Sequence, residues 1–144
     1  MKLDSKGKTA LHLREGLRLK PYLCTQKVPT IAMGNTFYLD GKKVSMKDKA
    51  LTVAQAVQLA DAITAKFEAG VRKAITSKIN QNQFNAIVSV AYNIGLGAFR
   101  GSTFLKLINI NPNDPLIGPS IMRWTANKEL IGRRKSEVAQ YFTK

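Results

Sequence analysis

Residues that carry chemistry are scarce in this sequence. Among its 144 residues there are one cysteine, one histidine and nine acidic residues. A single cysteine excludes an internal disulfide framework, and one cysteine with one histidine supplies too few ligands for a zinc site of these residue types. Because carboxylates are so few, each one can be weighed separately as a candidate catalytic group.

Long apolar runs are also missing. The first residues, MKLDSKGKTALHL, carry charge at Asp4, Lys6 and Lys8 and contain no apolar run of signal-peptide length. No stretch approaches the roughly 20 apolar residues that cross a bilayer. We therefore expect a protein that is made and folded in a cytoplasm, has no signal peptide and does not insert into a membrane.

Positive charge is abundant. Twenty-three lysines and arginines stand against nine acidic residues, so the net charge is +14 at pH 7. Such a field attracts polyanions, including nucleic acid, anionic lipid and acidic cell-wall polymers, and it also serves solubility. A nucleic-acid-binding module is the weakest of these interpretations, because the sequence shows no helix-turn-helix signature and few aromatics for base stacking.

The hydrophobic pattern changes along the chain. A short helix is predicted over 8–15 and ends at Gly16, a typical left-handed cap. The β-prone pieces between 17 and 46, with a turn at Asp40-Gly41, predict a small two- or three-stranded sheet.

The later part of the chain reads as helical. Thr52-Val53-Ala54-Gln55 matches a capping box and predicts a helix that runs to about Phe67 or beyond, with Gly70 as a place where it can bend or end. Further helices are predicted over about 84–95, after Ser102 as the cap, at 121–124 and at 134–142, with a loop over 109–119. These patterns predict an α+β fold in one domain, 1–144, with a helix and β lobe to about residue 50 and a helical lobe from about 51.

One acidic residue stands apart from the others. Glu15 ends the first predicted helix among leucines at 11, 13, 17 and 19. A carboxyl group in apolar surroundings loses hydration, which favours the protonated form that a general acid needs, although ion-pair networks use the same setting. The remaining eight stand on turns or polar faces, where a solvated surface charge is the usual role: Asp4, Asp40, Asp48, Asp61, Glu68, Asp114, Glu129 and Glu137.

Residues 15–30 read EGLRLKPYLCTQKVPT. This segment resembles the front of the phage-type lysozymes, the endolysin muramidases of glycoside hydrolase family 24. That family has Glu, eight residues, Asp or occasionally Cys, five residues and Thr, and Glu15, Cys24 and Thr30 stand at these positions. Two more blocks follow in the family's order, QFNAIVSVAYNIGLGAFRGSTFLKLIN at 83–109 and MRWTANKELIGRRKSEVAQYF at 122–142.

The resemblance implies a lysozyme-like fold with the active-site cleft between its lobes, and hydrolysis of the β-1,4 bond between N-acetylmuramic acid and N-acetylglucosamine in peptidoglycan. Glu15 is expected to protonate the leaving oxygen. Cys24 is expected to activate water or steady developing positive charge, and Thr30 to hold the water. No metal or organic cofactor is expected.

The same resemblance implies contacts in the helical lobe. Tyr92, Asn93 and Ser102 are expected to line the sugar groove, and Arg133 or Arg134 to approach Glu15. Core packing for Tyr92, helix capping for Ser102 and a solvated pair for the arginines are the structural alternatives.

Release and action on the wall also follow from the resemblance. A phage endolysin without an export signal implies a holin that permeabilises the membrane, after which the enzyme reaches the cell wall in the periplasm and lyses the host cell. A monomer is the expected state.

Two departures from the family pattern bear on activity. Cys24 replaces the usual Asp, and an ordinary thiol, with a pKa of about 8.5, is mostly protonated at neutral pH. Lys20, Lys27 and the basic field could lower that pKa. A catalytically weakened or inactive peptidoglycan-binding protein is therefore an alternative, and the stereochemical course stays open. The second departure is Ala32, where the family usually has Gly, next to Asn35, where it often has His.

Overall fold

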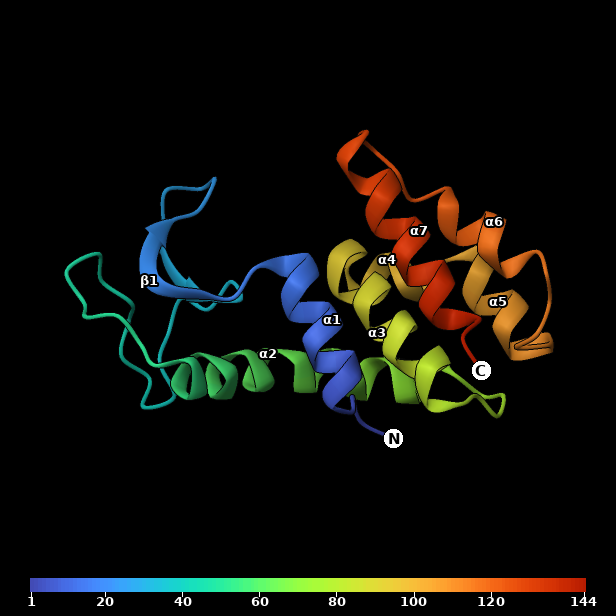
Figure 1. Cartoon of the computed structure of the whole chain (residues 1–144), viewed down its shortest axis with the longest axis horizontal. Helices are drawn as coiled ribbons and strands as arrows, with labels where there is room; N and C mark the ends of the chain where they lie inside the picture. Colours follow the sequence, from blue (N-terminus) through green and yellow to red (C-terminus); the bar gives the residue numbers. More distant parts are fainter. The chain divides into compact units, whose positions relative to one another are not determined.

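The computed structural model describes residues 1–144 (Figure 1). The chain forms two compact units: residues 10–66, called the small unit below, and residues 1–9 with 67–144, called the large unit. The predicted lobe boundary near residue 50 stays a prediction.

The two strands follow one another in the sequence and pair in one small antiparallel sheet, while the rest of the regular structure is helical, so the predicted α+β fold is confirmed. The elements are α1 (Ser5–Glu15), β1 (Arg18–Leu23), β2 (Pro29–Ala32), α2 (Val53–Ala74), α3 (Gln81–Ile94), α4 (Leu96–Arg100), α5 (Thr103–Ile110), α6 (Ile117–Met122) and α7 (Glu129–Tyr141). None of the helices combines the length and the apolar character needed to cross a membrane.

The sheet of the small unit is shorter than the predicted β region. β1 and β2 pair antiparallel, with Tyr22 opposite Thr30 and Leu23 opposite Pro29. Beyond β2 the only ladder contacts are isolated bridges, one of which joins Phe37 to Lys43 across the predicted Asp40-Gly41 turn. The turn is therefore present, but the segments on either side of it are too briefly paired to count as strands.

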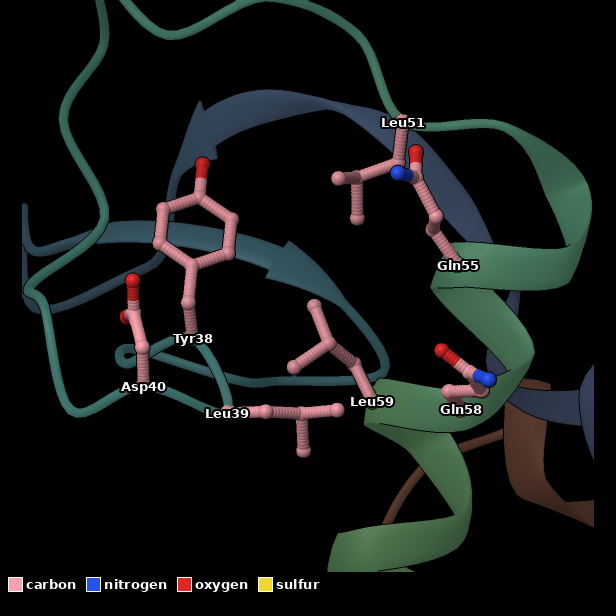
Figure 2. A pocket seen from close by; sticks show the side chains of 7 residues that line it. All are labelled: Tyr38, Leu39, Asp40, Leu51, Gln55, Gln58 and Leu59. Carbon is pink, nitrogen blue, oxygen red and sulfur yellow. The ribbon is translucent and has the colours of Figure 1, made fainter.

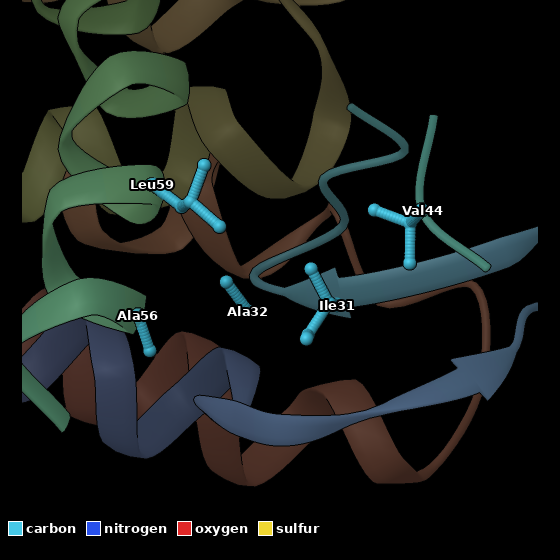
Figure 3. Packing of buried hydrophobic residues seen from close by; sticks show 5 residues of the cluster. All are labelled: Ile31, Ala32, Val44, Ala56 and Leu59. Carbon is cyan, nitrogen blue, oxygen red and sulfur yellow. The ribbon is translucent and has the colours of Figure 1, made fainter. Parts of the chain in front are cut away.

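A small apolar core fixes the sheet to α2. Ile31 and Ala32 from β2, and Val44 beyond it, pack with Ala56 and Leu59 of α2 (Figure 3). Burial of a side chain the size of leucine or isoleucine contributes about 1.5–3 kcal/mol. This contact therefore fixes β2, and with it Thr30, on a long helix.

α2 begins and continues for identifiable reasons. At its start the Thr52 N–H donates to Gln55 Oε1 (2.9 Å) and the Gln55 N–H donates to Thr52 Oγ1 (3.2 Å), which is the predicted capping box. The helix continues through Gly70, which the sequence marked as a place where it could bend or end. A Cβ on Gly70 would lie 2.6 Å from Leu96 Cδ2, so the glycine allows close packing there.

In the large unit, α7 packs against α3 and α6 (Figure 1). The α3 and α5 predictions are confirmed, and Ser102 caps α5 by accepting from the Leu105 N–H at 3.2 Å. α4 was not predicted, because five residues show no helical periodicity. α6 begins inside the predicted loop over 109–119, because Pro119 falls in its first turn, where a missing N–H costs no helical bond.

Two carboxylates that were expected on the surface are buried. Glu68 is 7% exposed and accepts from the Leu3 N–H at 3.0 Å. Glu137 is fully buried. The surface prediction is wrong for both. Glu68 accepts from a backbone N–H that is 65 positions away, and Glu137 pairs with Arg133 and Arg134 of its own helix and accepts from Ser89 of α3.

Candidate active site

Glu15 is the last residue of α1 and is half-buried. Gly16 ends the helix in a left-handed conformation (φ 77°), and its N–H donates to the His12 carbonyl at 2.8 Å, as the cap prediction requires. The chain then enters β1 at Arg18. The short connection places Glu15 close along the chain to the start of the sheet.

The leucines around Glu15 do not all enclose it. Leu11 is buried, but Leu13 is 82% exposed, so the expectation that Leu13 helps to bury the carboxyl group is wrong. Leu17 and Leu19 pack against the apolar core of the small unit. Helical geometry explains the outcome, because residues two apart in a helix face different directions.

Cys24 follows β1 and begins a tight turn. Its N–H donates to the Val28 carbonyl (3.1 Å), and the Lys27 N–H donates to the Cys24 carbonyl (2.8 Å). Lys27 has a left-handed backbone (φ 59°), which turns the chain back toward β2. The turn directs backbone N–H groups toward the sulfur.

These donors change the acidity of the thiol. Hydrogen bonds from the backbone N–H groups of Val28 and Gln26, and one with the Thr30 side chain, hold the pKa of Cys24 below its ordinary value. A lowered pKa was expected from neighbouring lysines and the basic field. The direction is as expected, but hydrogen bonds rather than lysine charges produce it.

Thr30 joins the sulfur to the backbone. It is 2% exposed, and its hydroxyl donates to the Val28 carbonyl at 2.8 Å. A hydroxyl has one proton. It can therefore accept from a neutral Cys24 thiol while it donates to Val28, or turn and donate to a thiolate. Two of the three predicted catalytic residues, Cys24 and Thr30, are thus in direct contact.

Ala32 and Asn35 show how the small unit accommodates its departures from the family pattern. Ala32 has a left-handed backbone (φ 58°), which glycine adopts without steric cost. Asn35 is 7% exposed and its amide donates to the Leu59 carbonyl at 3.0 Å. This hydrogen bond ties the segment after β2 to α2.

The structure also places the candidate groove residues of the large unit. Ser102 is buried as the cap of α5, and it lines an open pocket of about 290 Å³ together with Thr103, Ser120, Arg123 and Trp124. Tyr92 is half-buried and stacks on Phe67, with ring centroids 4.8 Å apart. Ser102 therefore caps α5 and also lines a pocket, whereas one side of the Tyr92 ring packs against Phe67.

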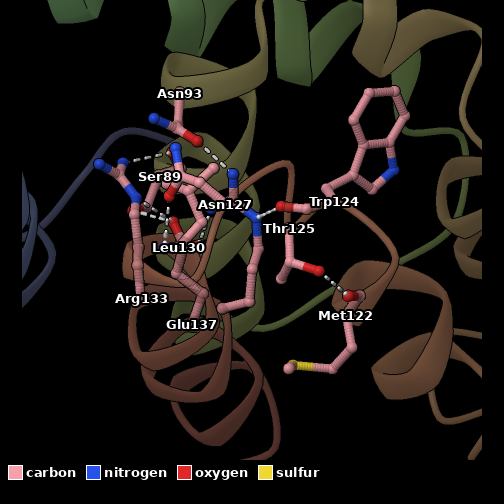
Figure 4. A network of polar contacts seen from close by, with 10 residues as sticks. Ser89, Asn93, Met122, Trp124, Thr125, Asn127, Leu130, Arg133 and Glu137 are labelled. Atoms are coloured by element: carbon pink, nitrogen blue, oxygen red, sulfur yellow. Dashed lines mark hydrogen bonds and ion pairs between the residues drawn. The ribbon is translucent and has the colours of Figure 1, made fainter.

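Arg134 and Glu137 form the centre of a buried polar network (Figure 4). Arg134 donates from Nε to the Trp124 carbonyl (2.8 Å), from Nη1 to Glu137 (2.5 Å) and from Nη2 to Asn93 Oδ1. Glu137 also accepts from Ser89 Oγ (2.5 Å) and Arg133 Nε (3.3 Å). The predicted approach of Arg133 or Arg134 to Glu15 stays a prediction.

The small unit holds a further pocket that the sequence did not indicate. It has a volume of about 330 Å³ and lies between Tyr38, Leu39 and the first turns of α2 (Figure 2). The Tyr38 hydroxyl donates to Asp48 at 2.7 Å. Burial and this carboxylate raise the pKa of Tyr38 to about 12. The tyrosine therefore stays protonated at physiological pH, and its hydrogen bond to Asp48 links the two ends of the segment between residues 38 and 48.

Known proteins are similar to this chain in both sequence and fold. Residues 12–137 match the phage lysozyme family. The endolysin of Salmonella phage P22 is 32% identical over 147 residues, covering 99% of each chain. The structure of the endolysin from Escherichia coli O157:H7 phage FAHEc1 is similar, with a TM-score of 0.88, 36% identity and coverage of 99% of this chain and 94% of that chain. The muramidase domain of SpmX from Asticaccaulis excentricus is also similar, with a TM-score of 0.82, 25% identity and 99% coverage of each chain.

A match over most of the chain, together with full-length relatives, is decisive. The chain belongs to the phage lysozyme family, as the resemblance of residues 15–30 indicated. Membership implies a lytic enzyme of the glycosidase type.

Proposed function

We propose that this chain is an endolysin muramidase, which hydrolyses the β-1,4 bond between N-acetylmuramic acid and N-acetylglucosamine in peptidoglycan and so lyses the host cell. The observation that carries the proposal is the contact between the Cys24 sulfur and the Thr30 side chain at the β1–β2 turn. Glu15 ends the helix that leads into the same strand pair. The similar solved structure named a muramidase domain supports the same bond specificity.

The chemistry needs an acid on one side of the bond and an acceptor on the other. In the proposed reaction, Glu15 donates its proton to the glycosidic oxygen as the bond to the sugar carbon breaks. Water attacks that carbon from the opposite face and gives its proton to the Cys24 thiolate. Thr30 holds the water through its hydroxyl oxygen. The donors around the sulfur serve this scheme, because they stabilise the anion that accepts the proton.

Charge and location complete the proposal. Peptidoglycan peptides carry carboxylates, which attract a protein with a net charge of +14. We propose synthesis in the host cytoplasm, release through a membrane permeabilised by a holin, and action as a monomer on the wall.

Mass spectrometry of digested muropeptides tests the bond specificity. Purified peptidoglycan treated with the protein should yield fragments whose reducing ends are N-acetylmuramic acid. Fragments that end in reducing N-acetylglucosamine, or cleavage of peptide bonds alone, contradict the proposal.

A second candidate is a peptidoglycan-binding protein of the same fold with weakened or absent catalysis. The sulfur in place of the usual carboxylate is its basis. Two substitutions separate the candidates: Cys24→Asp should retain or improve turnover, and Cys24→Ala should lose most of it. Wall binding without release of reducing ends would support the second candidate. Full activity of Cys24→Ala would show that position 24 carries no chemistry.

A further inference from the structure

A pocket with apolar walls opens in the large unit, at the C-terminal end of α2. Its volume is about 350 Å³, within the range of about 300–1,000 Å³ that is usual for small-molecule sites. Ile75, Ile79 and the buried ring of Phe84 supply apolar surface, and the half-exposed side chain of Met1 adds to it. The pocket can therefore take a hydrocarbon group.

Two exposed cations belong to the same lining, Arg72 in the last turn of α2 and Lys78 in the segment between α2 and α3. Neither forms an ion pair. No acidic residue stands between Glu68 and Asp114 in the sequence, and none lines the pocket. Glu68, one turn before Arg72, is 7% exposed and accepts from a backbone N–H. The positive charge at this pocket is therefore without a counter-ion of the protein.

The guanidinium group of Arg72 is anchored at one nitrogen only. Its Nη1 donates to the Met1 carbonyl at 2.8 Å, and its other N–H groups make no hydrogen bond within the protein. Anionic oxygens are the strongest acceptors for such donors. A cation with spare donors beside an apolar wall suits a ligand in which an anionic headgroup is joined to a hydrocarbon chain.

We infer that this pocket binds one anionic lipid of a membrane surface, with an acyl chain against Ile75, Ile79 and Phe84 and the phosphate group near Arg72 and Lys78. The inference goes beyond the proposed hydrolysis, because it uses none of the residues assigned to the reaction. Cations in the last turn of a helix also stabilise the helix dipole, but Lys78 lies beyond the end of α2. The net charge of +14 attracts any anionic surface, whereas the pocket adds a local contact that also requires a chain.

A soluble short-chain lipid tests the pocket directly. Dihexanoyl phosphatidylglycerol, added below the concentration at which it forms micelles, should shift the amide NMR signals of residues 72–84 in a saturable way. Dihexanoyl phosphatidylcholine, whose headgroup has no net charge, should bind more weakly. Shifts spread over the lysines of both units without saturation would mean that charge alone attracts the lipid, and would overturn the inference. Saturable shifts of the same signals by a single-stranded DNA oligonucleotide, without an effect of the lipid, would overturn it too.

Substitutions separate the pocket from the overall charge. Arg72→Gln and Lys78→Gln each remove one charge at the pocket, and Lys42→Gln and Lys43→Gln remove an exposed charge from the small unit as matched controls. Each pocket variant should weaken binding to vesicles of mixed phosphatidylglycerol and phosphatidylcholine about fivefold, the loss expected for one cation at an anionic surface, whereas the controls should bind like the wild type. Equal losses in the pocket and control variants would overturn the inference.

Two further measurements keep the result interpretable. Lys78 makes no hydrogen bond or ion pair, so Lys78→Gln should keep the melting temperature of the wild type even if Arg72→Gln lowers it. All four variants should release reducing ends from lipid-free peptidoglycan at the rate of the wild type. If the wild type releases none, the proposed function fails, while the vesicle and NMR results still decide whether the pocket binds lipid.

Discussion

In the small unit the sulfur of Cys24 is held by backbone N–H groups of a five-residue turn, whereas in the large unit the carboxylate of Glu137 is held by side chains from two helices. The first arrangement is local and lies near solvent. The second joins residues more than forty positions apart and is closed to water. The residue proposed to accept a proton therefore lies in the small unit, whereas the buried ion pair of Arg134 and Glu137 lies in the large unit.

The energetic consequences of the two arrangements differ. Water can replace part of a hydrogen bond to an accessible sulfur, so its loss changes reactivity more than stability. A buried charge that loses its partner cannot be rehydrated, so its loss mainly affects folding. Substitutions at the β1–β2 turn should therefore alter activity without unfolding the protein, and substitutions at the centre of the network should do the reverse.

The largest effect is expected for Glu15→Gln. Glutamine has the shape of the protonated acid but cannot donate its proton to a leaving oxygen, and general acid catalysis contributes about 10²–10⁴ in rate. Release of reducing ends from peptidoglycan should fall by at least about a hundredfold, with an unchanged melting temperature. Glu129→Gln, at an exposed position in α7, is the control and should be fully active. Normal lysis by Glu15→Gln would refute the general-acid assignment.

Glu137→Gln should affect stability rather than chemistry at the β1–β2 turn. The change leaves the buried guanidinium of Arg134 without its counter-ion, and breaking such a pair costs about 3–5 kcal/mol. Urea unfolding should show this loss, while Glu129→Gln on the same helix should change the free energy of unfolding by less than about 0.5 kcal/mol. Equal stability of the two variants would mean that the network does not hold the large unit together.

Thr30→Val should make the Cys24 thiol less acidic. Because the hydrogen bonds lower its pKa, the thiolate of the wild type forms at a lower pH than that of an ordinary cysteine. Valine keeps the shape of threonine but removes the hydroxyl, so the pKa should move back up and less thiolate should be present at neutral pH. The rate of alkylation by iodoacetamide as a function of pH reports this directly, since Cys24 is the only thiol. Thr25→Val, on an exposed residue of the same turn, should leave the profile unchanged.

The smallest effect is expected for Ala32→Gly. The left-handed backbone of Ala32 costs about 1–2 kcal/mol, which glycine removes, but the buried methyl group contributes about 0.8 kcal/mol and glycine gains freedom in the unfolded chain. These terms nearly cancel, so the free energy of unfolding should change by less than about 1 kcal/mol. Ala56 belongs to the same core but lies within α2, so Ala56→Gly removes no backbone strain. It should destabilise the protein more, because a glycine inside a helix costs about 1 kcal/mol relative to alanine. A larger loss for Ala32→Gly than for Ala56→Gly would show that the backbone at residue 32 is not strained.

The features that the sequence predicted are those encoded by residues close together. The Thr52–Gln55 capping box, the Ser102 cap and the Gly16 helix end each depend on three or four neighbouring residues, and each was found as expected. Glu137 could not be placed in the same way. Its ion-pair partners Arg133 and Arg134 are local, but its burial depends on the packing of α7 against α3, which brings in Ser89 from 48 positions away. For the same reason the left-handed Ala32 has no local signal, because alanine rarely adopts that backbone and tertiary packing imposes it.

Because of the contact between Gly70 and Leu96, residue 70 is an exception to the common practice of replacing helical glycines with alanine. Replacing a glycine inside a helix with alanine is a standard route to higher thermal stability, and Gly70, near the C-terminal end of α2, is an obvious target. The added methyl group would occupy the space that the Leu96 side chain now fills. Attempts to raise the thermal stability of this enzyme should therefore keep glycine at residue 70, or replace it only together with a substitution of Leu96 by a smaller side chain.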